Sequence, residues 1–216
     1  RGGRSGTAGP TGHLFTVLIQ IWKMVMKHNP HCEWIIENVD ITDMDDYYVI
    51  SNALQTGAVS INSINHSYTW RNRLFWTNIK LPPSWRDGYP QLDANTCLDL
   101  GRTIIPPVTT ITANWQGSMH QPFQFTSRPI QVWDEADNKP HYLRPHEAEK
   151  LMGMKPRCTE APGASARARL SIIGNAWDIN IAAMLLGHAR AAHRDGGAAR
   201  RAAAASCTAA AARTAT

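Results

Sequence analysis

The stretch Trp34-Ile35-Ile36-Glu37-Asn38-Val39 decides the fold class of this chain. A short apolar run with turn residues before it is typical of a buried β-strand. Asn29-Pro30 precedes the run and ends any helix that comes before it. We therefore predict a buried strand that ends in Glu37-Asn38-Val39.

Helices are predicted on both sides of this strand. From Gly12 to His28, apolar residues recur at the spacing of an amphipathic helix: Leu14, Leu18, Ile21, Trp22 and Val25. After the strand, Asp43 can cap a second helix over about 43–55, and Gly57 is expected to close it.

Two further strands follow these helices. Residues 59–64 nearly alternate between apolar and polar, and residues 73–79 are rich in aromatic and β-prone side chains. The order helix, strand, helix, strand, strand predicts the late half of an α/β sheet that ends in an antiparallel hairpin.

The second half of the chain is predicted to be less regular. Residues 82–140 hold several Pro, Trp and Gly, with one short β-like run at 108–112. Pro145 suits the first turn of a helix that runs to Met152. Residues 155–168 have the composition of a linker.

A last apolar helix is predicted from Leu170 to Leu186, entered through Gly174-Asn175. The tail, residues 189–216, contains 14 Ala but no apolar face that would dock it. We expect this tail to be disordered or a frayed helix.

Composition and charge place the chain among globular proteins. Its 216 residues are enough for one domain with a core, and 43% are hydrophobic while 18% are charged. The formal net charge is +5, but the tail carries +4 of it, which leaves the body nearly neutral. Bulk charge therefore does not argue for nucleic-acid binding.

Cysteine spacing and hydropathy exclude several other classes. The four cysteines show no C-x-x-C spacing, so we expect no metal site, no disulfide framework and reduced thiols. No apolar run approaches the roughly 20 residues that span a bilayer. The basic, Gly-rich start does not resemble a signal peptide.

Four separated stretches follow one another in a fixed order: Glu37-Asn38-Val39, Arg71-Asn72-Arg73 with Leu74-Phe75-Trp76, Leu143 to Met154, and Ile173-Gly174-Asn175-Ala176-Trp177. Together they resemble motifs of the DNA (cytosine-5)-methyltransferases, and most closely those of the animal de novo class. Softer matches are Thr11 to Phe15, Asp99 to Arg102 and Thr109 to Thr112. Arg144 and Met154 depart from the usual Thr and Phe.

This resemblance implies a fold and a division of the chain. The fold would be α/β, the late half of a class I S-adenosylmethionine-dependent methyltransferase (Rossmann-like) sheet plus a small irregular target-recognition region. Residues 1–81 would belong to the catalytic domain, 82–141 to target recognition and 142–188 to the C-terminal return of the catalytic domain. Residues 189–216 would be a low-complexity tail.

The resemblance also implies a site for a cytosine that has left the base stack. Its catalytic residues would be Glu37, Asn38, Arg71 and Arg73, and its S-adenosylmethionine-binding residues Asn175, Ala176 and Trp177. The Glu37 carboxyl would share a proton with ring nitrogen 3, help that is typically worth about 10²–10⁴-fold. Asn38 would order the loop. Arg73, with donors in fixed geometry, would hold the base carbonyl.

The irregular region is expected to contact DNA. Its candidate residues are Arg86, Arg102, Trp115, Phe123 and Lys139.

One element of the family pattern is missing. The family carries a nucleophilic Cys after a Pro, just before the segment that Thr11 to Phe15 resembles. None of the four cysteines here follows a Pro or precedes Thr11. We expect this Cys and a Gly-rich cofactor turn to lie upstream, so that the chain alone is inactive.

Three alternatives stay open at this stage. The protein is an inactive accessory relative of a methyltransferase, a transfer-RNA cytosine-5 methyltransferase, or an α/β fragment without activity. The expected partners are DNA and a second copy or related chain, with no membrane. The expected compartment is the nucleus in a eukaryote and the cytoplasm otherwise.

Overall fold

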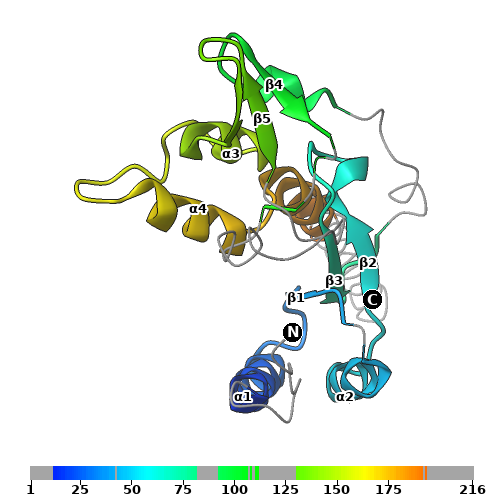
Figure 1. Cartoon of the computed structure of the whole chain (residues 1–216). Helices are drawn as coiled ribbons and strands as arrows, with labels where there is room; N and C mark the ends of the chain where they lie inside the picture. Colours follow the sequence, from blue (N-terminus) through cyan, green and yellow to red (C-terminus); the bar gives the residue numbers. More distant parts are fainter. Residues whose placement is uncertain are drawn as a thin grey trace, which may run out of the picture.

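Two small antiparallel sheets organise the protein (Figure 1). The computed structural model describes residues 12–41, 43–81, 92–106, 108, 110–111, 130–191 and 193. One sheet has the strand order β1-β3-β2, and the other has the order β4-β5-β6. Helices accompany both sheets, so the expected mixed α/β class is confirmed.

The first sheet contains β1 (Ile35–Val39), β2 (Val59–Asn62) and β3 (Asn72–Thr77). The central strand β3 runs antiparallel to both neighbours, so β1 and β2 are parallel to each other. Helix α2 (Met44–Leu54) connects these two strands, as a crossover between parallel strands requires. The predicted β2–β3 hairpin is confirmed.

Alternation along β3 gives this sheet two different faces. Leu74 and Trp76 point to one side, where they form a core with Ile19 of α1 (Gly12–His28) and with α2. Phe75 points to the other side and packs on Ile181 and other residues of the C-terminal helix, residues 179–191. Arg73 shares the face of Phe75, so the sheet has an apolar face under α1 and α2, and a face toward the C-terminal helix that also carries charge.

Helix α2 matches the predicted range of about 43–55, but Gly57 is not the residue that closes it. The Asp43 carboxylate accepts a hydrogen bond from the amide of Asp45, which confirms the N-cap. The helix ends at Leu54, and Gln55 closes it in the left-handed conformation with φ of 55°. Gly57 therefore does not close the helix, because Gln55 already supplies the left-handed turn.

The region predicted to be irregular contains the second sheet. Its strands are β4 (Arg102–Ile105), β5 (Gln131–Asp134) and β6 (Lys139–Tyr142). Asn138, with φ of 56°, forms the turn between β5 and β6. The strands are only four residues long and β6 contains Pro140, which an edge strand tolerates. Short length and Pro together conceal them in the sequence.

Two helices and a short 3-10 helix pack against this second sheet. They are α3 (Pro145–Leu151), α4 (Ala166–Asn175) and η4 (Ala94–Cys97). Their buried apolar side chains form one core with Ile104 and Val132 of the strands. The predicted helix at 145–152 is confirmed to within one residue.

The predicted helix from Leu170 to Leu186 is wrong. Helix α4 begins at Ala166, inside the expected linker, and ends at Asn175. A separate helix starts at residue 179, and the Asp178 carboxylate accepts from the amides of Asn180 and Ile181. Asp178 is thus the N-cap that starts the second helix, and Asn175 ends the first.

By composition and length, Ala166–Ala191 meets the criteria for a membrane span within the described part of the chain. Residues 176–178 interrupt this segment, and its side chains Ile173 and Leu185 are fully buried in the fold. Of the expected disordered tail, residues 189–191 and 193 are helical, and the rest lies outside the described residues.

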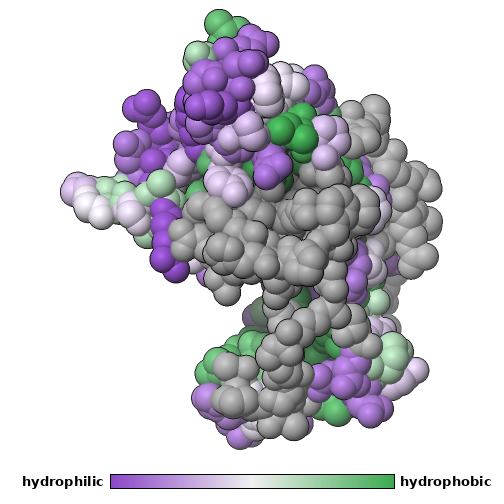
Figure 2. All heavy atoms as spheres, viewed as in Figure 1, coloured by the Kyte–Doolittle hydropathy of each residue, from purple (hydrophilic) through white to green (hydrophobic). Residues whose placement is uncertain are grey.

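Apolar side chains are exposed on the α1–α2 layer, at the bottom of Figure 2, where they lie among hydrophilic ones. On α1 the exposed ones are Leu14, Val17, Leu18, Ile21, Met24 and Val25, and on α2 they are Met44, Tyr48 and Val49. Helix α1 is therefore apolar on both its buried side and its exposed side, which is unusual for a helix that faces water.

Candidate active site

Glu37 and Arg73 meet on the charged face of the first sheet. Glu37 lies opposite Phe75 in the β1–β3 register, so Arg73 is its diagonal neighbour, within reach of long side chains. Nε of Arg73 is 3.0 Å from Oε1 of Glu37, and the side chains are 17% and 20% exposed. Two motifs that are 36 residues apart in the sequence thus form one ion pair.

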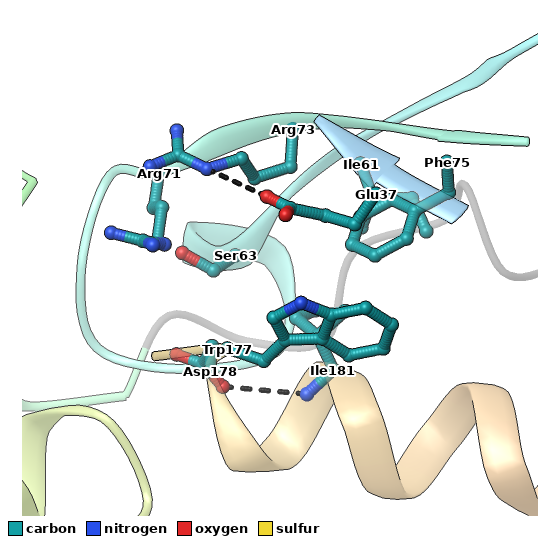
Figure 3. A pocket seen from close by; sticks show the side chains of 9 residues that line it. All are labelled: Glu37, Ile61, Ser63, Arg71, Arg73, Phe75, Trp177, Asp178 and Ile181. Atoms are coloured by element: carbon teal, nitrogen blue, oxygen red, sulfur yellow. Dashed lines mark hydrogen bonds and ion pairs between the residues drawn. The ribbon is translucent and has the colours of Figure 1, made fainter. Parts of the chain in front are cut away.

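This ion pair lies over a narrow pocket between the sheet and the C-terminal helix (Figure 3). The lining residues are Glu37, Ile61, Ser63, Arg71, Arg73, Phe75, Trp177, Asp178 and Ile181. The free volume is about 10 Å³, which is room for one water molecule at most. A larger ligand enters only if side chains move.

Trp177 forms the wall opposite the ion pair. Its indole meets the ring of Phe75 edge to face, with the ring centroids 5.7 Å apart. Of the three residues expected at the cofactor, only Trp177 lines the pocket. Asn175 is exposed, and the backbone carbonyl of Ala176 accepts a hydrogen bond from Arg71.

Arg71 holds the backbone around the pocket together. Its buried guanidinium donates to the carbonyls of Ile111, Gly174 and Ala176 at 3.1, 3.3 and 2.9 Å. Burial, together with the nearby charge of Arg73, lowers the pKa of Arg71 to about 10. Arg71 thus remains charged at neutral pH and joins three segments that are distant in the sequence.

Asn38 and Asp178 both accept hydrogen bonds from backbone amides of the protein. Oδ1 of Asn38 accepts from the amide of Val39 at 2.8 Å, and Asn38 does not line the pocket. Asp178 does line it, although sequence analysis missed this residue. Burial raises the pKa of Asp178, and hydrogen bonds from Ser67 and from the helix amides oppose that shift.

Phe75 was also missed, although a signal for it exists. It follows Arg73 by two residues on the same strand, and alternation places both side chains on one face. Ile61 and Ser63 come from β2 and the turn after it, where the sequence holds no comparable signal.

Arg102 is not a nucleic-acid contact, contrary to the expectation for the irregular region. Its side chain is 3% exposed and donates to Glu147 at 2.8 Å, to Asp134 at 2.5 Å and to the carbonyl of Tyr142 at 2.9 Å. A buried guanidinium that donates through all three of its nitrogens to groups inside the protein cannot reach a ligand. Lys139 is exposed on β6, and the other candidates lie outside the described residues.

A cluster next to Arg102 has the composition of a metal site. Ligand atoms of Asp99, His146 and Glu147 lie within 4.8 Å of one another. Arg102 pairs with Glu147, and Arg144 pairs with Asp99 at 2.7 Å, so both carboxylates already have cationic partners. These ion pairs, together with the bond from His146 to Asp99, account for the cluster without a metal.

None of the described cysteines lines the pocket. Cys32 donates to the carbonyl of Glu33, Cys97 is buried at the end of η4, and Cys158 is exposed in the turn after α3. The described part of the chain therefore supplies two acids, Glu37 and Asp178, and two arginines to this pocket, but no thiol.

Comparison with known proteins gave structural similarities only. No family model and no curated protein matches the sequence. The structure is similar to the Dnmt2 methyltransferase of S. pombe, with a TM-score of 0.47 and 13% identity over 77% of this chain and 71% of that chain. It is also similar to the methyltransferase EhMeth of Entamoeba histolytica, with a TM-score of 0.46 and 14% identity over 77% and 67% of the chains. With both scores below 0.5, residue roles rest on the geometry of the pocket.

Proposed function

We propose that this chain is part of an enzyme that transfers a methyl group from S-adenosylmethionine to carbon 5 of a cytosine in DNA. One observation carries the proposal. Glu37, Arg73 and Trp177 come from three separate motifs of the resemblance, and all three line one pocket.

The ion pair supplies the groups that a cytosine ring needs. A protonated or hydrogen-bonded Glu37 stabilises the negative charge that develops at ring nitrogen 3. Arg73 donates to the base carbonyl. Because the two side chains bind each other across a pocket that holds at most one water, the base must separate them to enter. The ion pair between Glu37 and Arg73 thus closes the site as long as no base is bound.

The cofactor residues fit S-adenosylmethionine only in part. Trp177, braced by Phe75, offers an aromatic wall, whereas Asn175 and Ala176 do not face the pocket. When bound, the cofactor supplies the methyl group. Arg71 acts beside it as a brace, since it fixes the carbonyls of Gly174 and Ala176 immediately before Trp177.

The nucleophilic thiol has no counterpart among the described residues. We propose that a segment outside them supplies it, and we expect the isolated chain to be inactive. This observation equally favours a second candidate, an accessory relative that binds an active partner. DNA is preferred over transfer RNA because residues 71–76 resemble the de novo DNA enzymes.

Transfer of a labelled methyl group tests the proposal. The natural full-length protein is compared with its Glu37→Gln variant on DNA and on transfer RNA. Loss of transfer to DNA in the variant supports the mechanism. Unchanged transfer in the variant would show that Glu37 has no catalytic role. Transfer to RNA but not to DNA would show that transfer RNA, and not DNA, is the substrate. A wild-type protein that methylates neither would favour the accessory relative.

A further inference from the structure

A second, wider cavity lies away from the candidate active site. This groove, of about 470 Å³, is lined by His66, Tyr68, Leu92, Thr96, Cys97, Lys150, Gly153, Met154, Asn180 and Ala183. Its volume is in the usual range for small-ligand sites. Asn180 and Ala183 lie on a different side of the C-terminal helix from Ile181, which lines the active-site pocket. The groove is therefore a separate site.

The walls of the groove are fixed by the fold. The Asn180 amide donates to Ser67 Oγ at 3.1 Å, which ties the C-terminal helix to the turn before β3. Gly153, with φ of 69°, lies so close to Asn180 that an added Cβ would be 3.0 Å from its amide nitrogen. Tyr68 packs against the core under the second sheet. The shape of the groove thus does not depend on a bound ligand.

The charge in the groove is positive and unbalanced. Lys150 is half-buried at the end of α3, and no ion pair joins it to a carboxylate within the described ranges. No Asp or Glu is among the lining residues. Asp93, the N-cap of η4, accepts from the amide of Asn95. The ammonium of Lys150 has no carboxylate partner among the lining residues and can bind an anion from solution.

Aromatic groups stand beside this cation. His66 and Tyr68 line the same groove, and Thr96 adds a hydroxyl. A cation, aromatic side chains and a hydroxyl in one groove suit a nucleotide, whose phosphate is anionic and whose base stacks on aromatic side chains. We propose that the groove binds one nucleotide of a nucleic-acid strand, with its phosphate at Lys150 and its base beside His66 and Tyr68.

The choice of a strand as the source of this nucleotide rests on the proposed function. A free nucleotide has the same chemistry and is the other source. The test of the groove measures binding and involves no methyl transfer. Its result can therefore contradict the proposal for the groove without contradicting the proposed methyl transfer, and the reverse also holds.

Fluorescence anisotropy of a labelled single-stranded DNA oligonucleotide, titrated with the full chain over a range of salt concentrations, tests the proposal. We expect Lys150→Gln to weaken binding about tenfold at low salt and to reduce the salt dependence by about one phosphate contact. Lys150→Arg keeps the charge and should retain most of the affinity. Lys155→Gln, an exposed lysine five residues further on, is the matched control.

Each outcome has a defined meaning. Loss in Lys150→Gln, with binding retained in Lys150→Arg and Lys155→Gln, supports the groove. Adenosine monophosphate is then added as competitor: displacement of the oligonucleotide near its own affinity makes a free nucleotide the occupant, and failure to displace it supports the strand. If Lys150→Gln and Lys155→Gln have the same affinity for the oligonucleotide, the proposal is wrong. Any change in affinity is then due only to the lower net charge of the protein.

Discussion

Each sheet of this protein provides an arginine that pairs with a carboxylate, and the two pairs differ in their exposure and in their other partners. Arg102 and Glu147 are 3% and 0% exposed, and Arg102 also binds Asp134 and a carbonyl. Arg73 and Glu37 are 17% and 20% exposed and lie over a pocket. The first pair is sealed and fixes the fold around it, whereas the second can exchange its partner for a ligand.

The largest effect should come from the exchangeable pair. In the natural full-length enzyme, Glu37→Gln should reduce methyl transfer about 10²–10⁴-fold, because an amide cannot supply the proton. The free energy of unfolding should change by no more than about 1 kcal/mol, as for other partly exposed pairs. Rate assays and urea denaturation check both, with the exposed Glu135→Gln as control. A large fall in the free energy of unfolding would show that Glu37 is a structural residue, as Glu147 is.

The sealed pair should behave in the opposite way. Glu147→Gln leaves the Arg102 charge buried and partly unbalanced, so the free energy of unfolding should fall by about 3–5 kcal/mol. Urea denaturation measures the loss. Glu160→Gln is the matched control, because its contact with Arg157 is 3.9 Å long and both side chains are mostly exposed. If the free energy of unfolding fell equally in Glu147→Gln and Glu160→Gln, the sealed pair would be no more important for stability than an exposed one.

Arg71 sharpens the comparison, since it was expected at the site but is bonded like a structural residue. Arg71→Met leaves the carbonyls of Ile111, Gly174 and Ala176 without their donor, and we expect a cost of about 2–3 kcal/mol. Amide hydrogen exchange should quicken around residues 176–178. Arg73→Met, which leaves these carbonyls bound, should not have that effect.

The smallest effect concerns pH and a second buried carboxylate, Glu149. Burial raises the pKa of Glu149, but hydrogen bonds from Thr159, Arg169 and backbone amides outweigh it, so the net pKa is lowered. A carboxyl with a lowered folded-state pKa contributes stability above its unfolded pKa and loses it as the pH falls through the folded value. Unfolding free energies measured from neutral to acid pH should therefore fall less steeply in Glu149→Gln than in the wild type.

Local patterns predicted the first sheet well. The apolar run before Glu37, the Asp43 cap and the aromatic run of β3 each act over a few residues, and the structure contains all three elements. The second sheet was missed because its short strands lie in a stretch rich in Pro, Trp and Gly, and β6 itself contains Pro140. The break at 176–178 was missed because both flanking segments are apolar and helical, and only the capping contact of Asp178 separates them.

The sequence by itself determined the α/β class, the alternation that puts Arg73 and Phe75 on one face, and the motifs that name Glu37 and Arg73. These follow from local rules of period and capping. Only the tertiary structure decided that Trp177 faces this pair, that Arg102 is sealed and that Lys150 lines a groove. Such contacts join residues that are up to 140 positions apart in the chain, as Glu37 and Trp177 are. The burial of a charged side chain depends on all of these contacts together, and burial decides whether that side chain can reach a ligand.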